Sequence, residues 1–189
     1  MLIQELFGDK SGFGSREINT LKAKCGQYLR ESASLPVYKE LPKTYNDFHR
    51  VKVRQKNFDD KVTEVFNLAF GEEFHNIRQR AIFASGIEPQ ITEDTEPFFV
   101  FPIDGYKFLY SKVVPNSSDN YQQVIDTMFE KFGDEKAIEL VTDVLKYTYV
   151  HENLAEGIVS DSEIIFYGIP FYYAVRVSAV PPYGKLLQK

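Results

Sequence analysis

Four polar side chains stand at the ends of predicted strands. Arg80 opens a short buried strand, and Ser111 closes an aromatic hairpin predicted over residues 94–114. Asp161 and Glu163 lie two residues apart, just before and at the start of a late strand. They supply a guanidinium, a hydroxyl and two carboxylates, which are groups that bind anions and exchange protons. Each also has a purely structural interpretation: an ion pair for Arg80, a strand end for Ser111 and an exposed carboxylate for Glu163.

Other patterns that would carry chemistry are missing from the sequence. The three histidines are isolated, and no cysteine or carboxylate cluster has the spacing of metal ligands, so a metal site is not expected. The single Cys25 falls in the apolar stripe of a predicted helix and is expected in the core. The chain has no GxSxG, GxGxxG or HExxH motif.

The order of Arg80, Ser111, Asp161 and Glu163 resembles the pattern of mono-ADP-ribosyltransferases. That family places an Arg on its first core strand, a Ser at the opening of a later strand, and Glu-x-Glu or Gln-x-Glu just before another. The resemblance implies that Arg80 grips the pyrophosphate of NAD bidentately and that Ser111 holds the nicotinamide ribose. It also implies that Glu163 binds the ribose 2′-hydroxyl and stabilises an oxocarbenium-like transition state, while Asp161 orients or deprotonates the acceptor.

The chain departs from that family pattern at three points. Ser111 is followed by Lys112-Val113 instead of completing a Ser-Thr-Ser motif, and Asp161 replaces Glu or Gln. Two predicted helices separate Ser111 from Glu163, where the family has mostly strands. The resemblance covers residues 78–178.

Four other segments resemble uncharacterised proteins of large tailed phages: RVKVRQK, FNLAF, RQRAIFASG and FPIDGYKFLYSK. This resemblance spans most of residues 50–178 and implies a protein of the bacterial host cytoplasm or of the virion. The first expectation is therefore a non-enzymatic component that acts in virion assembly through protein–protein contacts, without a cofactor. The alternative is an NAD-dependent transferase that modifies a host macromolecule.

The charge of this 189-residue chain is unevenly distributed. Residues 1–56 carry 11 Lys and Arg against 6 Asp and Glu, a net charge of +5, and the other residues carry 11 against 21, or −10. The basic segment is expected to contact a protein partner, another copy or its own acidic body. Nucleic acid is a weaker alternative, because the basic strand near residues 48–56 has no interleaved aromatic residues on which bases could stack.

The N-terminus shows no signal-peptide pattern, and no run approaches the ~18 apolar residues of a membrane span. We therefore expect neither export by a signal peptide nor a membrane partner. Residues 1–47 are predicted to form a helix (16–31) and an extended connector that face a partner or pack on the body. Residues 48–180 are predicted to form a single domain, followed by a tail at 181–189.

The expected fold class is α+β, with a mixed or antiparallel sheet. Its predicted centre is a hairpin about Asp104-Gly105 in which Phe101 lies opposite Phe108, with 97–103 as an edge strand because of Pro102. Further strands are predicted near 48–54, 80–85, 163–167 and 171–177. Amphipathic helices are predicted at 59–70, 118–132 and 134–148, the last two as an antiparallel pair covering one face of the sheet.

Overall fold

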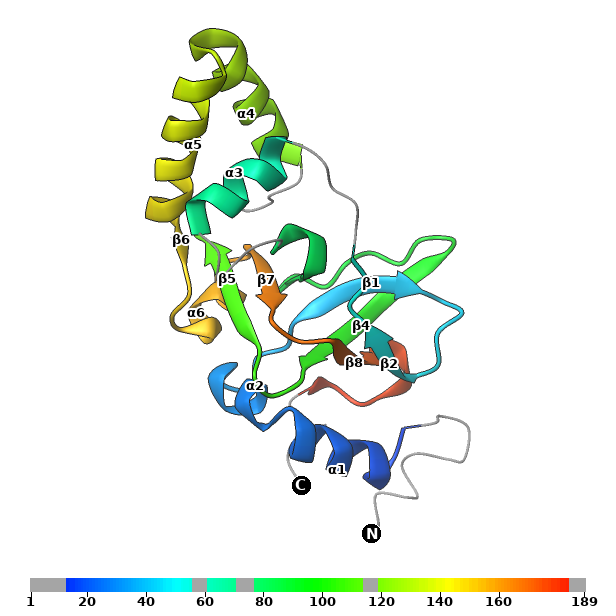
Figure 1. Ribbon diagram of the computed structural model, residues 1–189. Coiled ribbons are helices and arrows are strands. Elements are labelled where there is room, and N and C mark those ends of the chain that lie inside the picture. Colours follow the sequence, from blue (N-terminus) through cyan, green and yellow to red (C-terminus); the bar gives the residue numbers. More distant parts are fainter. Residues whose placement is uncertain (1–12, 56–60, 71–76, 114–118, 184–189) are drawn as a thin grey trace.

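The computed structural model describes residues 13–55, 61–70, 77–113 and 119–183, and it has the α+β fold expected from the sequence (Figure 1). Within that part of the chain, eight strands form one antiparallel sheet in the order β2-β8-β4-β1-β3-β7-β5-β6. The strands are β1 Tyr38–Pro42, β2 Phe48–Lys52, β3 Ile82–Ser85, β4 Thr95–Pro102, β5 Lys107–Ser111, β6 Tyr149–Val150, β7 Glu163–Tyr167 and β8 Phe171–Arg176. The helices are α1 Ser15–Lys24, α2 Gly26–Glu31, α3 Lys61–Phe70, α4 Asp119–Phe132, α5 Asp134–Thr148 and α6 Leu154–Val159, with short 3₁₀ turns η3 Arg78–Arg80 and η4 Val177–Ala179.

The predicted hairpin register is wrong, because β4 and β5 do not pair with each other. Phe101 lies opposite Tyr173 of β8, and Phe108 lies opposite Phe166 of β7. The turn at Asp104-Gly105 is present, with Gly105 at a φ of 91° that favours glycine. The chain nevertheless crosses there from one half of the sheet to the other.

Helix α2 holds the two strands apart. The Gln27 backbone N–H donates to Asp104 Oδ1 at 2.7 Å, and the Gln27 side-chain oxygen accepts from Gly105 N at 2.9 Å. The neighbouring Tyr28 ring is fully buried and packs edge-on against Phe101, at 5.7 Å between ring centroids, and against Phe166, at 6.3 Å. A buried aromatic side chain therefore occupies the space that a paired hairpin would close.

The prediction that residues 97–103 form an edge strand is also wrong. Strand β4 lies between β8 and β1, and its side chains from Glu96 to Pro102 are all buried. Pro102 is the last residue of the strand, opposite Tyr172, so its missing N–H interrupts no ladder beyond it.

The N-terminal helices pack on the body, which is one of the two arrangements predicted for residues 1–47, and they contribute to its core. The predicted helix breaks at Cys25 into α1 and α2, and Leu21, Cys25 and Tyr28 are buried. The segment predicted as a connector supplies β1, which lies near the middle of the sheet. Burial, and secondarily the Asp104 carboxylate, raises the pKa of the Cys25 thiol to about 12, so the thiol stays protonated, as a core residue and not a nucleophile would.

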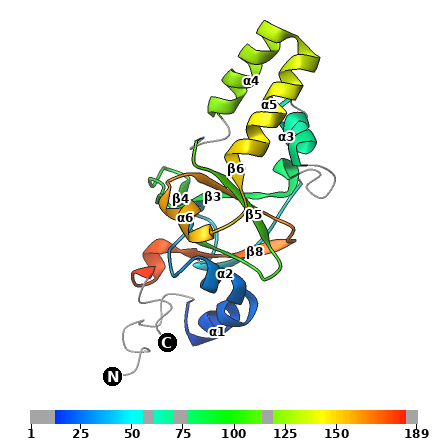
Figure 2. The ribbon, with the colours of Figure 1, turned by 90° about the vertical axis from the view of Figure 1, so that its left-hand side faces the viewer.

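Helices α3, α4 and α5 form a unit that projects from the sheet at the end opposite α1 and α2 (Figures 1 and 2). The α4–α5 pair is antiparallel, as predicted, and packs on α3. The unit meets the sheet through a cluster that includes Leu109, Ile165 and Tyr167, so it covers the β5–β7 end and extends beyond it. None of the helices in the described ranges is long and apolar enough to cross a membrane.

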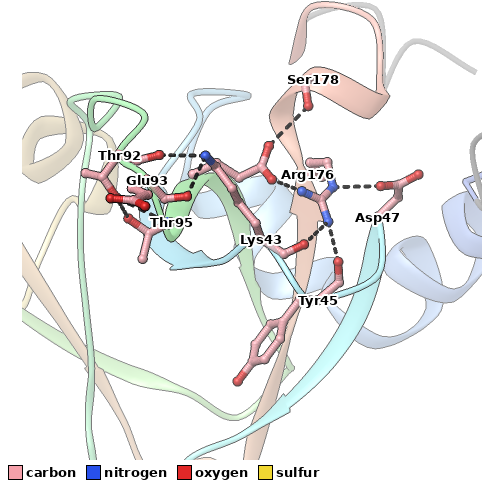
Figure 3. A network of polar contacts seen from close by, with 9 residues as sticks. Lys43, Tyr45, Asp47, Thr92, Glu93, Thr95, Arg176 and Ser178 are labelled. Carbon is pink, nitrogen blue, oxygen red and sulfur yellow. Dashed lines mark hydrogen bonds and ion pairs between the residues drawn. The ribbon is translucent and has the colours of Figure 1, made fainter.

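A cluster of polar contacts around Arg176 holds the β1–β2 connection against β4 and β8 (Figure 3). The Arg176 Nε donates to Asp47 Oδ1 at 2.7 Å, and its Nη1 pairs with the Glu96 carboxylate. Its Nη2 donates to the backbone oxygens of Lys43, at 3.1 Å, and Tyr45. The guanidinium also lies over the Phe98 ring, 5.0 Å from its centroid. All three guanidinium nitrogens of Arg176 therefore have partners within the fold.

Candidate functional site

A cleft of about 540 Å³ opens where β1 and β3 separate. The two strands share a single residue pair, Tyr38 with Ser85, whereas β3 and β7 share four pairs. Beyond that one pair the strands diverge, and the cleft lies between them. Its volume falls within the range of small-molecule sites. The lining residues are Tyr38, Lys39, Glu40, Phe83, Ala84, Ser85, Ile87, Pro89, Asp161 and Glu163.

Three of these residues form a row across neighbouring strands. Tyr38 of β1 pairs with Ser85 of β3, and Ser85 pairs with Glu163 of β7. Because residues directly opposite each other in an antiparallel sheet point to the same face, the phenol, the hydroxyl and the carboxylate are neighbours. The fold thus gathers groups that are 47 and 78 residues apart in the chain.

Two of the three carboxylates that line the cleft, Asp161 and Glu163, lie in the turn after α6 and at the first position of β7; the third is Glu40 of β1. Asp161 is exposed and has a left-handed φ of 58°, a conformation that Asp tolerates better than most residues. Ser162 between them is buried, and its hydroxyl accepts from Ser160 Oγ at 3.0 Å. With Ser162 turned inward, Asp161 and Glu163 both line the cleft.

A close backbone contact fixes this turn against β3. Gly86, which follows β3, lies so near the Ile158 carbonyl of α6 that a β-carbon there would overlap the carbonyl oxygen. Gly157 of the same helix packs on Tyr110 of β5, where a β-carbon would come within 2.7 Å of the ring. These contacts place the end of α6, and with it Asp161, beside Ser85.

The loop between β3 and β4 forms the opposite rim. Ser85 Oγ donates to the Ile87 backbone oxygen at 3.1 Å and holds the start of the loop. Lys43 Nζ donates to the backbone oxygens of Thr92 at 2.6 Å and Glu93 at 2.9 Å, which fixes its far end (Figure 3). The loop contributes Ile87 and Pro89 to the cleft, so this rim is apolar.

A cation and a phenol complete the site from β1. Lys39 Nζ donates to the Phe83 backbone oxygen at 2.7 Å, which places the ammonium group at the split between β1 and β3. Burial, and secondarily the Glu88 carboxylate, raises the pKa of Tyr38. Its hydroxyl therefore remains a hydrogen-bond donor at neutral pH.

The structure brings together only part of the constellation predicted from the sequence. Asp161 and Glu163 line the cleft. Ser111 follows Tyr110, which pairs with Ile164, so it lies beside Glu163 in the sheet, but it is 1% exposed and does not line the cleft. Arg80 is exposed at the end of turn η3, where its Nη2 donates to Gln55 Oε1 at 3.2 Å.

The role predicted for Arg80 is therefore wrong. Strand β3 runs antiparallel to β7, so its last residue, Ser85, meets Glu163, while its first residue, Ile82, meets Phe166. Arg80 precedes Ile82 and lies at the opposite end of β3 from the two carboxylates. Arg80 therefore does not line the cleft with Asp161 and Glu163.

Sequence reasoning missed Lys39 and Ser85. Lys39 lies in a segment taken as a connector, although Tyr38-Lys39-Glu40-Leu41 between two prolines is long enough for a strand. Ser85 lies at the end of the strand predicted near residues 80–85. The nearby Gly86 was a usable signal, because a glycine at a strand end often marks a close backbone approach.

Within the described ranges, no three His, Cys, Asp or Glu side chains gather in a way that could hold a metal ion. The cleft instead combines three carboxylates (Glu40, Asp161 and Glu163), an ammonium group, hydroxyls and apolar surface, a set suited to an organic ligand that carries both rings and polar groups. Comparisons of this chain with protein-family models, with curated proteins and with solved structures find no match.

Proposed function

We propose that this protein is an enzyme of the mono-ADP-ribosyltransferase type, which binds NAD in the cleft between β1 and β3 and transfers ADP-ribose to an acceptor. The observation that carries the proposal is the convergence of Asp161, Glu163 and Ser85 on one cleft that is lined on its other side by β1. The same carboxylate pair belongs to the sequence pattern that resembles this family.

The residues of the cleft match the chemical parts of NAD. The Tyr38 and Phe83 rings and the apolar Ile87 offer surface for a nicotinamide ring. Glu163 and Ser85, paired side by side, are suited to ribose hydroxyls, since a carboxylate accepts hydrogen bonds from them. Lys39, which also lines the cleft, would supply a positive charge for the pyrophosphate.

The proposed reaction breaks the bond between the ribose C1′ and the nicotinamide nitrogen. The bonding electrons leave with the ring, which is thereby neutralised, and positive charge develops on the ribose. Glu163 accepts a hydrogen bond from the 2′-hydroxyl and stabilises that charge, as carboxylates do in glycoside hydrolysis. The acceptor forms the new bond to C1′, and its proton passes to Asp161, which is exposed at the mouth of the cleft.

Lys39 lies on β1, the first strand in the chain, and under this proposal it takes the part of the Arg that the family carries on its first core strand. A Lys is a point charge and cannot form the bidentate contact that a guanidinium makes with a pyrophosphate. We therefore expect Lys39→Gln to raise the KM for NAD by roughly tenfold with little change in kcat, because it removes a charge–phosphate contact present in both the ground and transition states. Lys39→Arg should keep the KM within about threefold. Initial rates of nicotinamide release across a range of NAD concentrations give both constants.

The direct test of the proposed function is release of nicotinamide from NAD by the purified chain, with water as the acceptor. A rate well above the uncatalysed one, together with an increase in melting temperature in the presence of NAD, supports the proposal. Absence of both release and stabilisation at millimolar NAD would contradict it.

A second candidate function, contact with other proteins in an assembly, is supported by the projecting helices. The apolar residues Val124, Val144 and Tyr147 are 51%, 45% and 91% exposed on α4 and α5. Exposed apolar surface commonly marks a protein contact. Light scattering at rising concentration should then show self-association that Tyr147→Ser weakens. A mass of one chain at every concentration would count against contact between copies.

A further inference from the structure

The outer edge of the sheet at β2 carries a row of exposed cations. Arg50 and Lys52 alternate with Val51 along the strand, and Arg54 follows in the same alternation. Strand β2 pairs with β8 on one side, and no other strand of the described sheet pairs with its second side. Among the residues that the structure describes, no acidic side chain forms an ion pair with Arg50, Lys52 or Arg54.

Aromatic rings from the neighbouring strand lie beside these cations. Lys52 pairs with Phe171 of β8, and Arg50 pairs with Tyr173. The Arg50 guanidinium lies over the Phe171 ring, with its central carbon 3.7 Å from the ring centroid. Phe171 packs edge-on against Tyr173 at 5.7 Å, and Tyr173 stacks on Phe48 at 5.2 Å with an interplanar angle of 14°. The rings are half-buried and form a continuous base under the Arg50 side chain.

We infer that this edge, made by Arg50, Lys52, Arg54 and Phe171, binds single-stranded nucleic acid. The sequence argued against such a ligand because no aromatic residue lies between Arg50 and Arg54. The pairing of β2 with β8 supplies aromatic rings from residues more than 100 positions away in the chain.

Three features favour a single strand as the ligand. Alternate residues of a strand are about 6.6 Å apart, which is close to the spacing of successive phosphates in an extended nucleic-acid strand. The Arg50 guanidinium lies over the Phe171 ring, with its central carbon 3.7 Å from the ring centroid, and a cation beside aromatic rings is the combination that binds the bases and phosphates of a single strand. The remainder of the chain is acidic and repels a polyanion, so binding is directed to this edge.

The inference does not depend on the NAD proposal. In the sheet, β8 and β4 separate β2 from β1, which borders the cleft. The variants used to test it do not touch the cleft residues.

The test measures fluorescence anisotropy of a labelled oligothymidylate of about 12 nucleotides with the full-length chain, at several salt concentrations. Binding is expected at low salt and should weaken as salt rises. Arg50→Gln and Lys52→Gln should each weaken binding and reduce the slope of log affinity against log salt by about 0.7. Arg50→Lys should weaken binding roughly tenfold with an unchanged slope, because the positive charge remains but the planar guanidinium, which can stack on a base, is lost.

The matched control is Lys146→Gln, which removes an exposed cation from the distant helix α5. It should leave both affinity and slope unchanged. Phe171→Leu, which keeps an apolar side chain, should weaken binding as Arg50→Lys does. The inference is overturned by absence of binding at low salt, or by equal losses in the Lys146→Gln control. It is also overturned if Arg50→Lys and Phe171→Leu bind like the unchanged chain, since the edge would then attract any polyanion.

Discussion

Glu163→Gln is expected to reduce nicotinamide release from NAD by roughly 100- to 1,000-fold, the range seen when one group that stabilises transition-state charge is removed. The amide has nearly the shape of the carboxylate but carries no negative charge to oppose the positive charge that develops on the ribose. Glu163 is half-buried at the first position of β7, so the free energy of unfolding should change by no more than about 1 kcal/mol. Urea unfolding of both proteins separates a loss of activity from a loss of structure.

Two further carboxylates of the cleft serve as controls for Glu163. Glu40→Gln removes a charge from the same cleft at the edge of β1, where Glu40 accepts a hydrogen bond from Thr95, and should leave nicotinamide release within about threefold. Asp161→Asn should reduce nicotinamide release with water as the acceptor, but by less than Glu163→Gln does, because Asp161 takes the acceptor's proton and does not stabilise the charge on the ribose. Equal losses in the Glu40 and Glu163 variants would mean that the net charge of the cleft matters and that Glu163 has no special role.

The elements of this fold with strong local patterns could be predicted from the sequence. The helix pair α4 and α5 and the strands β3, β7 and β8 all lie where apolar spacing placed them. The residues around Asp104-Gly105 could not show that β4 and β5 do not pair, since Asp104-Gly105 does form a turn. What prevents the hairpin is the Tyr28 ring, which enters from a helix more than 70 residues earlier.

The same limit applies to the candidate site. Asp161 and Glu163 could be found from the sequence because they lie two residues apart, just before and at the start of a clear strand. Ser85 and Lys39 were not found, because their relation to Glu163 arises only from the order β1-β3-β7 in the sheet. Arg80 was assigned by its place before β3, but the direction of β3 puts Ser85 and not Arg80 against Glu163.

Gly86→Ala is expected to cost several kcal/mol of stability and to disrupt the cleft. The added methyl group would overlap the backbone carbonyl oxygen of Ile158, and a backbone atom cannot turn aside as a flexible side chain can. Overpacking of a rigid contact typically costs about 1–3 kcal/mol, and the closeness of this one favours the upper end. Relief requires α6 to move away from β3, and α6 leads directly into the turn that carries Asp161 and Glu163. NAD hydrolysis should therefore fall even where the protein remains folded.

Gly26→Ala is the matched control, because it makes the same chemical change at the first residue of α2. An added β-carbon there would lie 3.4 Å from its nearest atom, which belongs to the flexible Arg30 side chain. Alanine also has a higher helix propensity than glycine. The control should be neutral or stabilised by up to about 1 kcal/mol, with unchanged NAD hydrolysis. Urea unfolding and nicotinamide release measured on both variants compare the two sites directly. If Gly86→Ala were as stable and as active as Gly26→Ala, the contact between β3 and α6 would not position the carboxylates, and the geometry on which the proposed chemistry depends would have to be set elsewhere.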